Sequence, residues 1–368
     1  VDVQAIGNGG GSLVRADERT RTLHVGPDSA GADPGPVCYS RGGTVPTTTD
    51  AALVLGYIGA DTFAGGRVTL DRAAAEAAIT EIGKKVGLGM QACASGIVTI
   101  AEHQMADLIR RMTIQKGFDP RDFVLFSFGG AGPMHAGVFA FELGIKKVIV
   151  PQGRMASTWC AFGAASADIL HIAEQVNIMT SPFTADVLNA EFSQLVEGLR
   201  EQLLAEKAPS VTHVFRCSLD VRHKGQINEV EVLLPSAELS PDQVTAITED
   251  FHTLYQQIYG KGSSFLRAKL EAVTFRVRAS AEIAKPSLSL ATLTDEIPEV
   301  ANREPRPIFW RQLDDTVETP VFQGGQLVPG NLVNGPAVIE TRDTTIVVHP
   351  GRRATVDGYG NFELELEA

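Results

Sequence analysis

Two glycine-rich loops are the segments of this chain whose composition is best suited to chemistry. The first, Gly9–Ser12 (GGGS), follows an alternating apolar run that starts at Val1. The second, Gly129–Gly132 (GGAG), follows the apolar run 123–128. Glycine lacks a Cβ, so successive backbone N–H groups can point into one concavity and hold an anion. Both loops are expected at the carboxyl ends of strands, where open α/β sheets bind ligands, so the pair predicts a site for a phosphate-bearing ligand.

Each loop is also compatible with a simpler structure. Neither contains the Gly-Lys-Ser/Thr of a Walker A loop, and neither has G-x-G-x-x-G spacing. A single glycine run can therefore be a tight turn and nothing more. The occurrence of two such loops after two predicted strands favours the ligand site.

Asp33 is the candidate catalytic residue. It is the one carboxylate in the segment 29–39, which is too rich in glycine, proline and alanine for a regular element. Near a bound phosphate, Asp33 could orient a metal ion or a water molecule. The alternative is that it caps the turn before Pro34, which is the commoner role of an aspartate at such a position.

The cysteines and histidines predict neither a metal site nor a nucleophile. The four cysteines are far apart without a C-x-x-C pair, which is typical of a reducing compartment. No H-x-x-x-H or H-E-x-x-H spacing and no nucleophile elbow occurs. His135, after the second glycine loop, could contact a ligand, although capping or packing is the commoner role. His103 is expected to be structural, and His223, in a predicted hairpin turn, to be solvated.

Length and charge limit the class of protein. With 368 residues, of which 44% are hydrophobic, the chain can bury a core and hold two or more domains. A formal net charge of −12 with scattered Lys and Arg argues against a nucleic-acid-binding surface. No apolar run approaches the roughly 20 residues of a membrane-spanning helix, and no signal peptide is visible. We therefore expect a cytoplasmic protein that binds neither nucleic acid nor membrane.

The elements around the second loop predict a βαβ unit. Residues 123–128 predict a strand, 134–143 a helix that ends before Gly144, and 147–150 a second, parallel strand. Upstream, 71–82 predicts a surface helix. A buried helix follows it, marked by the apolar stripe Ile97, Ala101, Met105, Leu108 and Met112.

After about Asp168 the pattern changes to a half-exposed, antiparallel sheet. Residues 215–222 alternate between apolar and polar, with 230–234 as the hairpin partner. Ser240-Pro241-Asp242-Gln243 is a capping box that opens an amphipathic helix. Residues 283–307 are expected to form a connector, and the short strands after Ala337 an all-β tail.

Four strings of the sequence resemble the second half of the hydantoinase A / 5-oxoprolinase family, which includes the ATP-binding subunits of acetone and acetophenone carboxylases. They are DVQAIGNGGGS, GPDSAGADPGPVCYSRGGTVPTTTDAALVLG, GFDPRDFVLFSFGGAGPMHAGVFAFELGIKKVIVP and GPAVIETRDTTIVVHPGRRATVDGYGNFELEL. Together with the segments between them, they extend over nearly the whole chain. The chain is identified as a member of this family by resemblance.

The resemblance implies an actin-like ATPase (ribonuclease H-like) fold, whose nucleotide lies between two lobes. The implied fold class is α/β and α+β, and this chain would be the second lobe with its C-terminal regions. The implied domains are 1–175 (second lobe), 176–285 (α+β), 286–310 (connector) and 311–368 (small all-β domain).

The same resemblance implies which residues bind the nucleotide. The first loop matches the family's second phosphate loop, and the second loop matches its adenosine turn. The segment 152–160 departs from the family's pattern, and its Arg154 would add a cation nearby. The implied cofactor-binding residues are Asn8, Gly9, Gly10, Gly11, Ser12, Gly129, Gly130, Ala131 and Gly132.

The implied function is activation of a small-molecule substrate by phosphorylation from ATP. A lactam, imide or enol would be phosphorylated. The metal ion would be Mg²⁺ or Mn²⁺ delivered with the nucleotide, and no metal site is expected within this chain. The protein would be part of an ATP-dependent cyclic-amide hydrolase or a ketone carboxylase, and a hydantoinase B-type subunit would complete the reaction.

The first phosphate loop of the fold has no counterpart here. We therefore expect an N-terminal lobe, in the same polypeptide or in a separate chain, and little activity of this chain alone. The alternative is a non-catalytic assembly subunit that docks the B-type partner without productive nucleotide binding.

Overall fold

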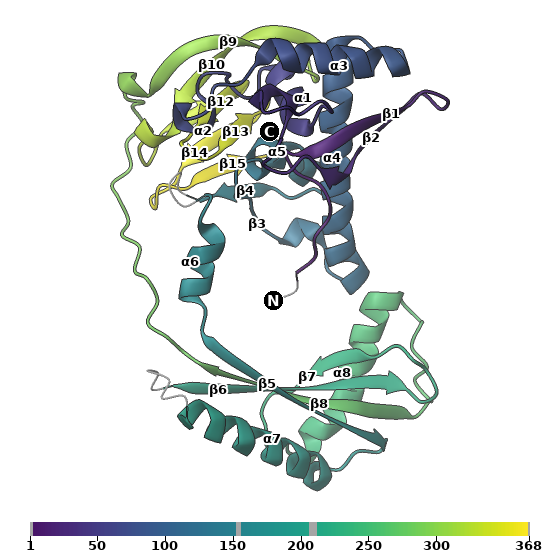
Figure 1. Cartoon of the computed structure of the whole chain (residues 1–368). Helices are drawn as coiled ribbons and strands as arrows, with labels where there is room; N and C mark the ends of the chain where they lie inside the picture. The colour runs from purple at the N-terminus through teal and green to yellow at the C-terminus, as the bar shows by residue number, and fades with distance from the viewer. Residues whose placement is uncertain (1–2, 152–155, 206–211, 367–368) are drawn as a thin grey trace. The chain divides into compact units, whose positions relative to one another are not determined.

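The computed structural model describes residues 3–151, 156–205 and 212–366 (Figure 1). The chain forms two compact units. The first combines Val1–Ile114, Phe118–Phe162 and Leu288–Ala368, and the second consists of Gln115–Gly117 and Gly163–Ser287. The second unit is thus inserted into the sequence of the first.

The first unit begins with a β-hairpin and a layer of helices. The strand β1 (Ser12–Asp17) pairs with β2 (Thr22–Ser29) in antiparallel fashion. The helices that follow are α1 (Thr48–Leu55), the short α2 (Phe63–Gly66), α3 (Arg72–Val86) and α4 (Met90–Thr113). The predicted helices at 71–82 and 97–112 correspond to α3 and α4.

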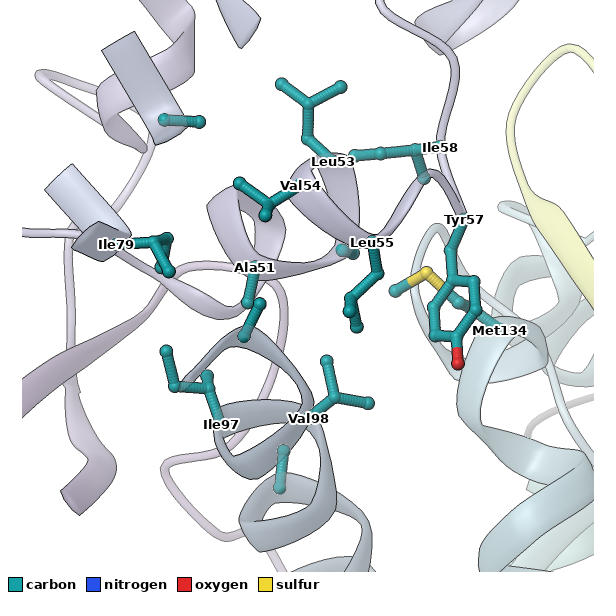
Figure 2. Packing of buried hydrophobic residues seen from close by; sticks show 14 of the residues in the cluster. Ala51, Leu53, Val54, Leu55, Tyr57, Ile58, Ile79, Ile97, Val98 and Met134 are labelled. Carbon is teal, nitrogen blue, oxygen red and sulfur yellow. The ribbon is translucent and has the colours of Figure 1, made fainter. Parts of the chain in front are cut away.

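Helix α1 is the centre of the first hydrophobic core. Every one of its residues is buried, since its sequence TTDAALVL offers small or apolar side chains on nearly all sides. Figure 2 shows Leu55 of α1 in one apolar cluster with Ile97 and Val98 of α4 and with Met134. This packing fixes the segments on both sides of α1, which later prove to line the site.

A five-stranded sheet of order β11-β14-β15-β4-β3 contains the predicted βαβ unit. The strands β3 (Leu125–Phe126) and β4 (Lys147–Val150) pair in parallel, with α5 (Gly132–Glu142) between them, as predicted. The other strands come from the C-terminal part of the chain. They are β11 (Leu332–Asn334), β14 (Arg353–Val356) and β15 (Phe362–Glu365).

A second sheet of order β13-β12-β10-β9 completes the first unit. Its strands are β9 (Asn302–Trp310), β10 (Asp315–Gln323), β12 (Ala337–Glu340) and β13 (Thr345–Val348). The strands β10 and β12 are parallel, and the other neighbours are antiparallel.

The C-terminal strands do not form the separate all-β domain predicted at 311–368. Buried residues of these strands share two cores with the N-terminal helices, and β9 lies within the predicted connector 286–310. The physical reason is that strands this short bury too little apolar surface alone to be stable. They therefore complete the sheet begun by β3 and β4, and the predicted domain boundaries differ from the units of the structure.

The second unit has the predicted half-exposed antiparallel sheet, of order β5-β8-β6-β7. Its helices α7 and α8 share one core with alternate strand residues. The predicted capping box at Ser240 opens α8. The elements of the second unit are β5 (Ile169–Thr180), α7 (Ala185–Ala205), β6 (His213–His223), β7 (Val230–Leu233), α8 (Pro241–Tyr259) and β8 (Leu270–Ala281). The helix α6 (Trp159–Ser166) contains residues of both units.

The segment before the first glycine loop differs from its prediction. Within the described residues, 3–8 form no strand, and Val3 is 79% exposed. A strand needs a partner for its backbone hydrogen bonds, and no described strand pairs with this segment. The loop Gly9–Ser12 leads into β1 instead of following a strand.

None of the helices formed by the described residues combines the length and the apolar composition that crossing a bilayer requires.

Candidate functional site

The two glycine loops line one cavity of the first unit. The cavity has a volume of about 230 Å³, and its lining includes Gly10 and Gly11 from the first loop and Gly130 and Ala131 from the second. The loops approach each other closely, because a Cβ added to Gly10 would lie 3.9 Å from the Cβ of Ala131. Segments far apart in the sequence are thus brought to one site.

The first loop is held by its carbonyl groups, which leaves its amides available. The Gly10 carbonyl accepts from both the amide (2.9 Å) and the Oγ1 (2.8 Å) of Thr49, and the Gly11 carbonyl accepts from the Ala30 amide at 2.9 Å. The amides of Gly10 and Gly11 donate no hydrogen bond within the described residues. Two unused N–H groups at a cavity wall are suited to bind an anionic oxygen.

The second loop offers amides in the same way. Thr344 Oγ1 donates to the Gly130 carbonyl at 3.2 Å, and the Gly129 amide donates to Ala156 O at 2.7 Å. In the part of the chain that the structure describes, the amides of Gly130, Ala131 and Gly132 have no acceptor. Because α5 begins at Gly132, its positive dipole end faces this turn.

One wall of the cavity is apolar and aromatic. The rings of Tyr39 and Phe63 lie 5.9 Å apart, and Ile58 and Met134 add apolar side chains. Aromatic and aliphatic side chains of this kind pack against a planar base. The cavity therefore combines a surface for an apolar ring with two loops of free amides.

Asp50 holds the segment that carries this wall. Its carboxylate is fully buried and accepts hydrogen bonds from the amides of Val37, Cys38 and Thr47 and from Thr47 Oγ1, at 2.7–3.2 Å. Pro36, immediately before this segment, lines the cavity. Asp50 thus has a structural role and fixes the loop between β2 and α1.

An acidic turn between β12 and β13 lines the cavity and was missed by the sequence analysis. Glu340 pairs with Arg306, and Asp343 Oδ1 lies 2.9 Å from Arg67 Nη2. The carboxylates are therefore already engaged. The segment Glu340–Thr344 lies within the last of the four strings that resemble the family, and this was the one sequence feature that could have indicated its role. Nothing in its composition indicated that it would lie beside the glycine loops.

A resident metal ion is not indicated by the side chains present. Among the described residues, no group of three or more His, Cys, Asp or Glu is placed to hold one. A Mg²⁺ ion at this cavity would thus have to bring phosphate oxygens and water as ligands, which is its usual way of binding.

Several predicted site residues shape the loops instead of lining the cavity. Ser12 is 3% exposed, and its Oγ accepts from the Gly9 amide at 2.8 Å. Asn8 donates to the Ala101 carbonyl at 2.7 Å. Gly9, Gly129 and Gly132 are not part of the lining.

Asp33 lies in an exposed turn and does not line the cavity, although Gly31 and Pro36 on either side of it do. This position fits the turn better than the catalytic role, which stays a prediction. Arg154 lies outside the described residues.

The histidines depart from the predictions in one case. His223 is 2% exposed, not solvated, because it is the last residue of β6 and packs edge-on against Phe251 and Tyr255. His103 is on the surface and lies 2.9 Å from Glu142. His135 is completely buried, as the packing alternative predicts.

His349 should make the first unit sensitive to acid. It is 5% exposed, and burial lowers the pKa of its imidazole from 6.5 to about 4. The unfolded chain takes up this proton below about pH 6.5 and the folded chain only near pH 4, so stability falls as the pH decreases through this window. Between pH 7 and 4.5 we expect a loss of about 2.5 kcal/mol from this group.

Urea unfolding followed at both pH values measures this loss. The variant His349→Gln should lose correspondingly less stability between them, since glutamine does not titrate. Equal losses in the variant and the wild type would show that other groups carry the acid sensitivity.

Comparison with known proteins places the chain in a family. The family model described as "Hydantoinase/oxoprolinase" matches residues 1–173, and the model described as "Hydantoinase/oxoprolinase C-terminal domain" matches residues 180–366. The chain belongs to the hydantoinase/oxoprolinase family. The resemblance stated from the sequence is thereby confirmed.

Two curated relatives and one solved structure indicate what this hydantoinase/oxoprolinase chain is similar to. It is 35% identical to the caprolactamase subunit alpha of Pseudomonas jessenii, covering 99% of this chain and 52% of that protein. It is 34% identical to the acetophenone carboxylase gamma subunit of Aromatoleum aromaticum, over 98% of this chain and 50% of that protein. The crystal structure of the ATP-dependent caprolactamase from Pseudomonas jessenii matches with a TM-score of 0.90 and 34% identity, over 98% of this chain and 52% of that one. The chain spans about half the length of these relatives.

Proposed function

We propose that this chain provides one side of an ATP site in an enzyme that phosphorylates and so activates a lactam, an imide or an enol. The observation that carries the proposal is the meeting of two loops with free amides at one cavity with an aromatic wall. The names of the relatives support it, since one is an ATP-dependent caprolactamase and another a ketone carboxylase subunit. Gly10 and Gly11 would bind phosphate, and the turn at Gly130 the adenosine.

Phosphorylation fits the chemistry of these substrates. An amide or enol oxygen is a poor leaving group until it becomes a phosphate ester. Backbone amides that point at the transferring phosphoryl group stabilise the charge that develops on it, and their geometry is fixed before the reaction. Bound with the nucleotide, Mg²⁺ would supply further neutralisation of the phosphate charge.

The proposed site needs parts that this chain does not contribute. In an actin-like ATPase the N-terminal lobe closes on the nucleotide from the other side, and its phosphate loop would face Gly10 and Gly11. A hydantoinase B-type subunit would then hydrolyse or carboxylate the activated substrate. The relatives named as subunits are consistent with such an assembly.

The test is phosphate release from ATP. Residues 1–368 alone should release phosphate negligibly, because half of the phosphate contacts are absent. With the N-terminal lobe and the B-type subunit restored, a matching substrate should raise the rate of phosphate release at least about 100-fold above that of the lone chain, since removing one such hydrogen-bond donor commonly costs 10²–10³-fold in rate. The substrates to compare are caprolactam, hydantoin, 5-oxoproline, acetone and acetophenone, the ketones with bicarbonate.

The outcomes separate the two candidate functions. Substrate-stimulated phosphate release by the lone chain would contradict the half-site. If the complete assembly forms but binds no ATP, as measured by calorimetry, the chain is an assembly subunit and the proposed function is wrong.

A further inference from the structure

A largely buried group of ionisable side chains lies directly behind the second glycine loop. Glu102 of α4 is 3% exposed, and its Oε1 lies 3.4 Å from Nδ1 of the fully buried His135 in the first turn of α5. Its Oε2 forms an ion pair with Arg311 Nη2 at 2.6 Å, and Arg311 also donates to Thr99 Oγ1 at 2.6 Å. None of these side chains lines the cavity, so the proposed chemistry does not use them.

Both glycine loops are attached to the same turn of α4. Asn8, which precedes the first loop, donates its Nδ2 to the carbonyl of Ala101 at 2.7 Å. The next residue of α4 is Glu102, which holds His135 and thereby the start of the helix that follows the second loop. The turn Ala101–Glu102 is thus a common support for two loops that are more than a hundred positions apart in the sequence.

The carboxylate of Glu102 is held in its charged form. Burial by itself raises its pKa, but His135 and Arg311 outweigh burial, so the pKa lies below its usual value. The other titratable groups that face it are His349 and Tyr57, and burial lowers the pKa of the first and raises that of the second. A buried charge of this kind keeps its partners in one arrangement, because any displacement leaves it unpaired.

We propose that Glu102 is a positioning residue that couples the two glycine loops, so that the placement of one depends on the placement of the other. Through the Ala101 carbonyl the turn sets the first loop, and through His135 it sets the second. The coupling itself is a property of the fold, and only its consequence for nucleotide binding rests on the proposed function.

The chain contains a matched control pair on the same two helices. His103 of α4 and Glu142 of α5 lie 2.9 Å apart, with side chains 58% and 29% exposed. This pair joins α4 to α5 as Glu102 and His135 do, but on the surface, where ion pairs contribute little. The variant Glu142→Gln therefore removes this surface pair, together with the ion pair between Glu142 Oε1 and Arg110 Nη2 at 2.6 Å, without disturbing the buried turn.

Hydrogen exchange without nucleotide tests the coupling directly. The amides of Thr49 and Ala30 report the first loop, since they donate to Gly10 and Gly11, and the Met134 amide reports the second, since it donates to Ala131. We expect Glu102→Gln to speed exchange at all three by about tenfold, and Asn8→Ala, a milder change, to speed it at Met134 as well. Glu142→Gln should change none of them. Faster exchange at Thr49 and Ala30 alone in Asn8→Ala would overturn the proposal.

A double-mutant cycle carries the test to binding. The affinity for Mg·ADP is measured by calorimetry on the wild type, on the single variants Asn8→Ala and His135→Gln, and on the double variant, each in the native protein. We expect each single variant to bind about tenfold more weakly and the double variant to lose no more than the worse of the two. Asn8→Ala with His103→Ala should be additive. Additive losses of affinity for Asn8→Ala and His135→Gln would overturn the coupling but not the proposed function. A wild type that binds no Mg·ADP would overturn the proposed function. In that case hydrogen exchange would still test the coupling.

Discussion

Replacing Gly130 with valine should weaken nucleotide binding by about 100-fold, equivalent to about 2.7 kcal/mol, and leave the fold intact. A Cβ at this position would lie 3.7 Å from the Asp343 carbonyl oxygen, which is an ordinary van der Waals distance. The branched methyl groups would then occupy the cavity where the adenosine is proposed to lie. Calorimetric titration of the complete protein with Mg·ATP measures the affinity, and a thermal scan confirms folding.

Gly198→Val is the matched control for this experiment. Gly198 lies in α7, and nothing is within 4 Å of an added Cβ. The same change of residue type should therefore leave the affinity unaltered. An unchanged affinity in Gly130→Val would remove the adenosine assignment of the second loop, whatever the first loop binds.

Replacing Leu364 with alanine should destabilise the first unit by about 2–5 kcal/mol. Leu364 is 1% exposed and lies in β15, between β14 and β4, where it contributes to the second hydrophobic core. Its loss leaves a cavity beneath the sheet that supports the second glycine loop. Urea unfolding measures the change in the free energy of unfolding, and nucleotide affinity should fall in urea earlier than in the wild type.

Leu233→Ala provides the comparison. Leu233 is also a strand leucine, but it is 69% exposed in β7 of the second unit. Its removal should change stability by no more than about 0.5 kcal/mol. If Leu364→Ala were no more destabilising than Leu233→Ala, Leu364 would not be part of the core of the first unit.

The parts of the fold that are local in sequence could be predicted from it. The run 123–150 has a strand, a glycine turn, a helix and a second strand in direct succession, and the structure has β3, α5 and β4 there. The capping box at Ser240 is local as well, because its hydrogen bonds join residues three positions apart. Periodicity and capping describe a chain within one or two turns, which is sufficient for these elements.

The parts that depend on distant segments could not be predicted. The strand β15 alternates apolar and polar residues, but this pattern does not state that its neighbour is β4. The acidic turn at Glu340–Thr344 lines the cavity because the fold places it beside segments that are distant in the sequence. His223 is buried because helix α8 covers the end of β6. In each case the tertiary neighbour determines exposure, while the local pattern only allows it.

The insertion of β15 between β14 and β4 also has a consequence for the order of events during synthesis. When β4 leaves the ribosome, the strand that will cover its free edge has not yet been made. Glu365 pairs with Lys147 only after the sequence of the second unit, which lies between them in the chain, has been synthesised. Contacts between such distant segments form slowly, and an open strand edge invites pairing with other chains in the meantime. The second unit, a continuous stretch apart from three residues, can be complete earlier. The nascent chain should thus depend on chaperones until its last strands emerge, and truncation after residue 287 should yield aggregates instead of a stable first unit.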